Sequence, residues 1–127
     1  MFDQIDTLRM AQALGRHAAN RHRVTATNVA NADTPGYRAR DLRDFDPNHG
    51  PGIGLRTTRP GHVAAGGWGG GHDAMVDAQG EPSPNGNTVS LEDEMVRAAD
   101  ASRQFDLSLS VMRSGMTLLR TAIGQRG

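Results

Sequence analysis

Helix-breaking residues are confined to the middle of this chain of 127 residues. All six prolines lie between Pro35 and Pro84, and eleven of the sixteen glycines lie between Gly50 and Gly86. Because proline and glycine interrupt helices, only the two ends of the chain are suited to long helices. This partition predicts a mainly α protein. Elongated N- and C-terminal helices form a coiled coil, and a Gly/Pro-rich irregular segment with at most a short β-hairpin joins them.

The same partition divides the chain into three parts within one domain. Residues 1–34 hold the N-terminal helix, residues 35–86 an extended turn and the Gly/Pro-rich loop or hairpin region, and residues 87–127 the C-terminal helix. Only 36% of the residues are apolar, against ~45–50% in an average globular domain. A helix over residues 91–123 would be ~50 Å long. We therefore expect an elongated molecule with a thin core.

The N-terminal segment, residues 2–31, has the apolar spacing of a helix. The face that this spacing defines has few large side chains and many small ones, which let another helix come close. Its members are Phe2, Ile5, Leu8, Gly15, Ala19, His22, Ala26 and Val29.

The C-terminal segment carries a 3.5-residue apolar repeat, which is typical of a coiled-coil seam. Ser90 and Asp93 resemble a capping box at its start, and acidic residues follow in the first turn. The repeat predicts an intramolecular seam against the N-terminal helix, with Ser102 as its one polar member. Its apolar members are Leu91, Met95, Ala98, Phe105, Leu109, Met112, Met116, Leu119 and Ile123.

A second apolar row runs along the same helix, roughly opposite the first. One partner helix can cover only one row, so we interpret the second row as a contact with another subunit. The alternative is a helix folded into one larger core, for which this chain has little material. The proposed intersubunit row consists of Val96, Ala99, Leu107, Val111, Leu118 and Ala122.

No pattern in the sequence indicates catalysis, a cofactor or a metal site. We expect solvated histidines: two are five residues apart instead of four, and three lie in the loose middle. A chain without cysteine or lysine has neither thiolate chemistry nor a P-loop. Its zero net charge gives no global attraction to nucleic acid or an anionic membrane. The histidines are His17, His22, His49, His62 and His72.

Three further features of the sequence concern the middle and its borders. Asp41, Asp44 and Asp46 alternate with arginines, which predicts a salt-bridged surface turn rather than an acid/base pair. Residues 53–57 alternate like a short strand. Trp68 is either an anchor for a partner or an isolated aromatic residue.

The first residues of the chain lack the layout of a cleaved signal peptide, and no apolar run is long enough to span a membrane.

One segment, residues 28–42, is more specific than a generic turn: Asn-Val-Ala-Asn-Ala-Asp-Thr-Pro-Gly-Tyr-Arg-Ala-Arg-Asp-Leu. Its Pro-Gly pair suits the central positions of a type II turn. The segment resembles the N-terminal signature of the bacterial flagellar axial proteins, the rod, hook and hook-associated family. Residues 87–95 resemble the start of that family's C-terminal helix. The turn and the signature are carried by Asn28, Asn31, Ala32, Asp33, Thr34, Pro35, Gly36 and Tyr37.

The resemblance covers residues 1–44 and 87–127 and is strongest to the small proximal rod members. It implies a structural, non-enzymatic subunit without a cofactor, which polymerises by helix packing into the torque-transmitting axis of the flagellum. It implies the basal body and its periplasmic rod as the location, with export by the flagellar type III apparatus. The implied partners are other rod proteins, the rod–ring adaptor FliE, the MS ring and further copies of the chain in a helical array.

A hypothesis from another class remains beside the structural one. A soluble helical adaptor or export chaperone would use the second apolar row to bind one partner helix. A peptidoglycan-binding or ligand-binding role for the Gly-rich middle has less support in the sequence. Neither reading involves nucleic acid or direct insertion into a membrane.

Overall fold

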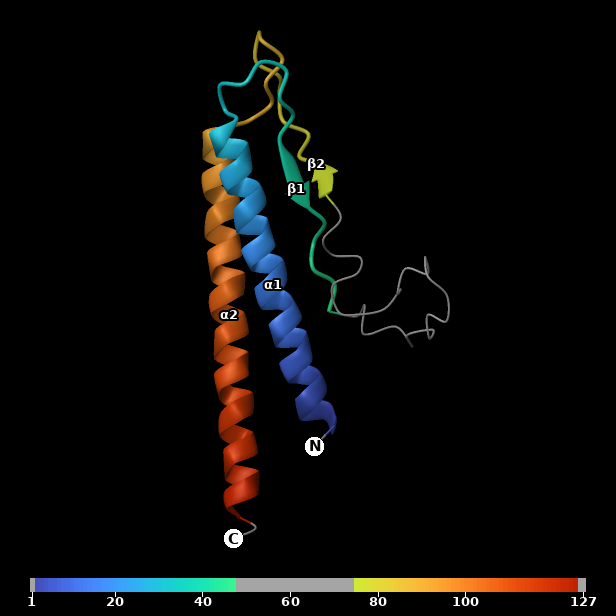
Figure 1. Cartoon of the computed structure of the whole chain (residues 1–127), viewed down its shortest axis with the longest axis vertical. Coiled ribbons are helices and arrows are strands. Elements are labelled where there is room, and N and C mark those ends of the chain that lie inside the picture. The colour runs from blue at the N-terminus through green and yellow to red at the C-terminus, as the bar shows by residue number, and fades with distance from the viewer. Residues whose placement is uncertain (1, 48–74, 126–127) are drawn as a thin grey trace, which may run out of the picture.

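Two long antiparallel helices dominate the structure, a computed structural model that describes residues 2–47 and 75–125 (Figure 1). Helix α1 spans Phe2–Ala30 and helix α2 spans Leu91–Gly124. They lie side by side as a hairpin, with both chain termini at its open end. The predicted mainly α fold with two terminal helices is confirmed. The predictions for residues 53–57, Trp68, His49, His62 and His72 lie outside the described residues.

A short pair of strands lies beside α1. Strand β1 spans Arg40–Leu42 and strand β2 spans Met75–Asp77, and they pair antiparallel with Arg40 opposite Asp77. Strand β1 contacts α1 and separates it from β2. The N-terminal helix is therefore covered on one side by α2 and on another by β1.

Local sequence signals determine where α2 begins. Ser90 is the N-cap residue, and its side-chain oxygen accepts a hydrogen bond from the backbone N–H of Asp93. Three acidic residues in the first turn face the positive end of the helix dipole. The predicted cap is confirmed.

The contact between α1 and α2 is made by small side chains. Ala18 and Ala101 are fully buried. A Cβ atom added to Gly15 would lie 2.9 Å from Ser108 Oγ, and one added to Gly115 would lie 2.6 Å from Leu8 Cδ2. Small residues on both helices therefore let the two backbones come close. Of the face predicted for the N-terminal helix, Leu8, Gly15 and His22 contact α2, whereas Ile5, Ala19, Ala26 and Val29 are exposed.

The line of α2 residues that faces α1 differs from the predicted seam. Glu94, Ala101 and Ser108 are the buried residues of α2, and the heptad line that they form continues to Gly115. The predicted seam residues Ala98, Leu109, Met112 and Leu119 are half-buried beside this line. The other predicted members are exposed and do not belong to an intramolecular seam; they are Leu91, Met95, Phe105, Met116 and Ile123.

This change of register has a physical reason. The closest approach of two helices selects the smallest side chains, and on α2 these are the residues of the 101–108–115 line. At ~100° per residue, the predicted seam and the second row lie on the two sides of that line. Helix α1 covers the middle of a broad apolar arc and leaves both margins exposed. The expectation was that it would cover one of the two rows completely, and the structure differs from this.

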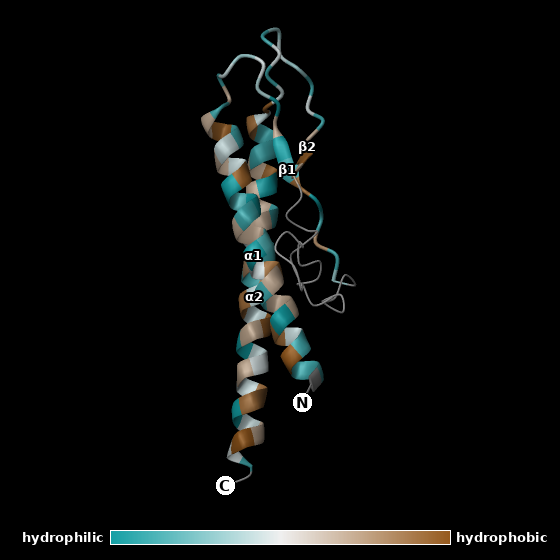
Figure 2. Ribbon diagram, turned by 45° about the vertical axis from the view of Figure 1, so that its right-hand side comes forward, coloured by the Kyte–Doolittle hydropathy of each residue, from teal (hydrophilic) through white to brown (hydrophobic). Residues whose placement is uncertain are grey.

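We call these margins the first flank and the second flank. The first flank comprises the five exposed residues of the predicted seam. The second flank comprises Val96, Leu107 and Leu118, which are 55–60% exposed. Figure 2 shows hydrophobic residues on the outer parts of α2 down to its C-terminal end, where α1 no longer lies beside it.

Candidate functional site

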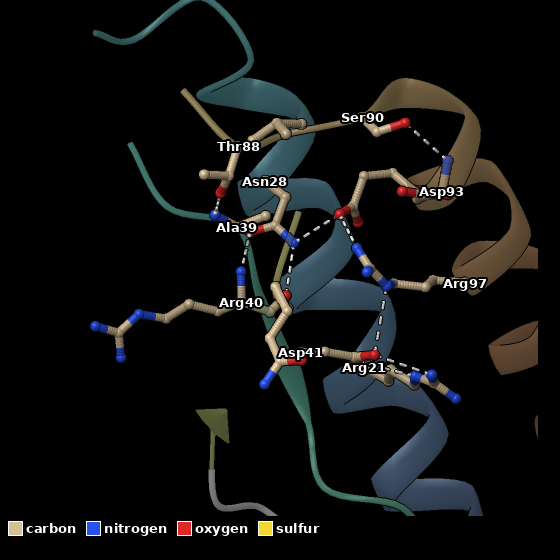
Figure 3. A network of polar contacts seen from close by, with 12 residues as sticks. Arg21, Asn28, Ala39, Arg40, Asp41, Thr88, Ser90, Asp93 and Arg97 are labelled. Carbon is tan, nitrogen blue, oxygen red and sulfur yellow. Dashed lines mark hydrogen bonds and ion pairs between the residues drawn. The ribbon is translucent and has the colours of Figure 1, made fainter. Parts of the chain in front are cut away.

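The closed end of the hairpin holds a polar network that joins two distant parts of the chain (Figure 3). Residues 28–42 supply one side of it, and residues 85–94 supply the other. These are the two segments that carry the resemblance to a known signature. We call the network the clasp.

Asn28 is the centre of the clasp and is fully buried. Its Nδ2 donates to the carbonyl oxygen of Arg40 at 2.7 Å and to Glu94 Oε1 at 3.0 Å. Its Oδ1 accepts from the hydroxyl of Tyr37 at 3.0 Å and from the backbone N–H of Arg40 at 3.1 Å. One amide therefore uses both donors and both lone pairs to connect α1, the turn, β1 and α2.

Asn87 closes the end of α1 from the other side of the clasp. Its Nδ2 donates to the carbonyl oxygens of Asn31 at 2.9 Å and Thr34 at 2.8 Å, and its Oδ1 accepts from the N–H of Val89 at 2.8 Å. Carbonyl groups after the last turn of a helix have no partner within the helix. Here both carbonyls accept a backbone N–H group of the turn, and a side chain 53–56 residues away donates a second hydrogen bond to each.

Thr88 extends the clasp to the start of β1. Its Oγ1 accepts from the N–H of Ala39 at 2.7 Å, and its own N–H donates to the carbonyl oxygen of Tyr37 at 3.0 Å. The chain passes so close here that a Cβ atom on Gly80 would lie 2.3 Å from the carbonyl oxygen of Thr88. Only glycine fits at position 80 without a shift of the backbone.

The predicted turn lies at the edge of the clasp. Gly36 has φ +73°, and the N–H of Tyr37 donates to the carbonyl oxygen of Thr34 at 3.3 Å, as in a type II turn. The N–H of Gly36 donates to the carbonyl oxygen of Asn85 at 3.0 Å. The turn prediction is confirmed. Of the other signature residues, Ala32 is half-buried, and Asp33 and Pro35 are exposed.

Replacing Gly36 with valine should lower the free energy of unfolding by about 1–2 kcal/mol, because a β-branched residue resists positive φ. Nothing lies within 4 Å of the added Cβ, so a clash contributes nothing. Urea unfolding followed by circular dichroism measures the change. Gly36→Asn is the control, because asparagine tolerates this conformation and should remain close to the wild type. Equal stabilities of the two variants would contradict the assigned turn.

A chain of ion pairs runs beside the clasp between the helices. Asp41 binds Arg21 through two bonds of 3.0 Å, and its Oδ2 lies 3.4 Å from Nε of Arg97. Arg97 also pairs with Glu94. The hydrogen bonds with Asp41 raise the pKa of Arg21 above its usual value, against the opposing effect of burial. The predicted surface turn is therefore corrected for Asp41, because β1 places it between the helices.

Two of the predicted solvated histidines contact other elements. His17 is buried, and its Nε2 donates to the carbonyl oxygen of Arg43 at 2.8 Å. Nε2 of His22 lies 3.1 Å from the hydroxyl of Ser102. The described residues contain no cluster of three or more histidine, cysteine or acidic side chains suited to a metal ion. In the same part of the chain, neither helix is apolar over a sufficient length to cross a membrane.

Sequence reasoning missed the burial of Glu94, which it read only as a charge at the helix dipole. A signal was present, because Glu94 starts a heptad line that continues through three small residues, Ala101, Ser108 and Gly115. A line of small residues indicates close helix contact. A carboxylate at its end then requires a polar partner from the other helix.

The second candidate surface consists of the two flanks of α2. Single exposed apolar residues are ordinary, but eight large ones along one helix form extended apolar margins. Of the proposed intersubunit row, Val96, Ala99, Leu107, Leu118 and Ala122 are exposed and Val111 is half-buried. A groove of ≈ 350 Å³ lies beside this row at the open end, lined by Asp3, Gln4, Thr7, Ser110, Val111, Ser114, Gly115 and Leu118.

The sequence is similar to those of known flagellar proteins. The family described as "Flagella basal body rod protein" matches residues 16–38. The chain is 35% identical to the flagellar basal body rod protein FlgB of Cereibacter sphaeroides, over 87% of this chain and 92% of the relative. It is 33% identical to FlgB of Salmonella typhimurium, over 90% and 91%. It is 34% identical to FlgB of Escherichia coli, over 88% and 89%.

Proposed function

This chain belongs to the flagellar basal body rod protein family, and from this premise we propose that it is a structural subunit of the proximal rod. In this role, copies of the hairpin pack side by side into a helical array that transmits torque. The proposal gives the chain a structural and not an enzymatic task. It has no need of a cofactor.

The observation that carries the proposal is the exposure of apolar residues on both flanks of α2. Met95 on the first flank is 72% exposed, and Val96 on the second is 60% exposed. Burial of apolar surface contributes about 25 cal/mol per Å². Because the flanks lie on opposite sides of α1, they suit two different neighbours. A subunit with a different contact on each side forms an open array, whereas an adaptor for one helix requires a single flank.

The clasp supports the mechanical part of this role. Each described bond fixes one segment relative to another, and the buried amide of Asn28 fixes four elements at once. All four hydrogen-bonding positions of this buried amide are satisfied, and such buried polar contacts make a structure rigid. A hairpin that keeps its angle under load passes rotation to its neighbours without bending at its closed end.

The partners and the location follow from the family as proposals. We assign to the chain other rod proteins, the adaptor FliE and the MS ring as neighbours, together with further copies of itself. The periplasmic part of the basal body is the proposed location. Export through the flagellar type III apparatus is the proposed route.

Purified basal bodies from the host test the role directly. An antibody against the chain should label the base of the rod in electron micrographs, and deletion of the gene should abolish rods while leaving the rings. Complementation with the wild-type gene is the control. Complete rods in the deletion strain, or a chain found only in a soluble complex of fixed size, would instead support the adaptor hypothesis.

A further inference from the structure

Helix α1 carries a stripe of exposed arginines, and the last of them, Arg23, also borders a groove shared with β1 and β2. Arg9, Arg16 and Arg23 recur every seven residues, and all three are exposed. Within residues 2–47 and 75–125 they form no ion pair. The positions between them on this face, Gln12 and Ala19, are also exposed and are not charged. We call this face the arginine stripe.

The outer face of α2 carries charges of the opposite sign. Glu92 and Asp106 are exposed, and neither forms an ion pair within the described parts of the chain. Between them, Asp100 and Arg103 form an ion pair, so their charges cancel. Val96 and Ala99 supply an apolar surface in the same interval. We call this face the acidic stripe.

The two stripes match in length. Fourteen residues separate Arg9 from Arg23, and fourteen separate Glu92 from Asp106. At ~1.5 Å per residue, each pair of charges spans ~21 Å. A helix that lies along the other helix therefore brings both charge pairs together at once.

One copy of the chain cannot join its own stripes. Within the hairpin, Leu8 meets Gly115, Gly15 meets Ser108 and His22 meets Ser102. These contacts lie on the inner faces of the two helices, whereas both stripes lie on outer faces. The charges of both stripes are therefore open to a second molecule.

We propose that the arginine stripe docks antiparallel on the acidic stripe of a second copy, with Arg9 beside Asp106 and Arg23 beside Glu92 of that copy. The antiparallel direction follows because copies that point the same way in an array present α1 and α2 in opposite directions. This inference rests on the proposed function and specifies one of its contacts. In the same register Ala19 lies against Val96 of the second flank, so an apolar contact lies between the two charge pairs.

The register also predicts an axial displacement between the copies. Within one chain the level of Arg23 corresponds to about residue 100 of α2, judged from the neighbouring contact of His22 with Ser102. Glu92 lies about eight residues nearer the closed end. Adjacent copies are therefore displaced by ~12 Å along the helix axes.

A charge swap in the host tests the pairing. Arg9→Asp alone and Asp106→Arg alone should each lower the amount of chain in purified basal bodies by about tenfold or more, since like charges then face each other. The double variant should recover to within about threefold of the wild type. Arg120→Asp, an exposed site on α2 that in this register lies beyond the start of the second copy's α1, is the matched control and should have little effect. A double variant no better than its parents, with unchanged circular dichroism, overturns the pairing.

Cysteine pairs test the register independently, because the chain has no cysteine of its own. Ala19→Cys and Val96→Cys, co-expressed as separate chains, should form a disulfide-linked dimer in oxidised basal bodies. Ala19→Cys with Ser110→Cys, about 21 Å farther along α2, should not. Incorporated chains that link only at another register overturn this inference and leave the proposed function intact. Absence of the wild-type chain from basal bodies overturns the proposed function, and this inference with it.

Discussion

Replacing Asn28 with alanine should lower the free energy of unfolding by about 3–5 kcal/mol. The substitution removes four hydrogen bonds and leaves the N–H and carbonyl of Arg40, the hydroxyl of Tyr37 and the carboxylate of Glu94 without this partner. Each buried polar group left unsatisfied costs about 1–3 kcal/mol, and the costs are not additive. Small domains have only about 5–15 kcal/mol of stability in total, so this loss should be a large fraction of the total.

Urea unfolding of the full chain, followed by circular dichroism, measures this loss. Asn28→Asp is the isosteric companion, because it keeps the acceptor but loses the donors and places a second carboxylate beside Glu94. It should be destabilised to a similar degree. Asn31→Ala is the matched control, because the side-chain bonds of Asn31 are exposed, and should change stability by less than about 1 kcal/mol. Similar stabilities for Asn28→Ala and Asn31→Ala would show that the clasp does not hold the hairpin closed.

Replacing Leu107 with aspartate should abolish assembly without affecting the monomer. Leu107 is 55% exposed on the second flank, so the change should alter monomer stability by less than about 0.5 kcal/mol. In the proposed array the same position would be buried, where an unpaired carboxylate costs several kcal/mol. Incorporation into basal bodies should therefore fall by about a hundredfold or more, and the cells should not swim.

Two neighbouring positions separate the flank from the helix contact. Leu109 is half-buried beside α1, so Leu109→Asp should lower monomer stability by a few kcal/mol as well. Ser110 is exposed, so Ser110→Asp adds the same charge without removing an apolar side chain and should assemble far better than Leu107→Asp. If Leu107→Asp enters the rod at the wild-type level, the second flank is not an intersubunit surface.

The features that the sequence predicted well depend on neighbours along the chain. The bounds of α1 and α2 follow from the placement of proline and glycine, the cap at Ser90 from its spacing to Asp93, and the turn from Pro35-Gly36. Each signal acts within a few residues. The tertiary contacts of the fold do not override these local preferences.

The features that the sequence did not predict depend on a second segment. The spacing of apolar residues in α2 does not determine which part of its broad apolar surface α1 covers. That choice depends on where the two helix backbones can come closest. Asp41 has arginines beside it in the sequence, but β1 carries it to Arg21 and Arg97 instead. Similarly, nothing near Asn28 in the sequence shows that its amide binds a carboxylate 66 residues away.

The pairing of β1 with β2 has a consequence for how this chain tolerates change in length. Leu42 and Met75 are partners in the strand register, so the chain leaves the hairpin and returns to it at almost the same point. A longer or shorter excursion between them need not move either helix, and doubling its length costs only about 0.6 kcal/mol in closure entropy. The segment between the paired strands is therefore a suitable place for insertions. Engineers can graft a tag or a folded module there and expect the helical scaffold to keep its geometry.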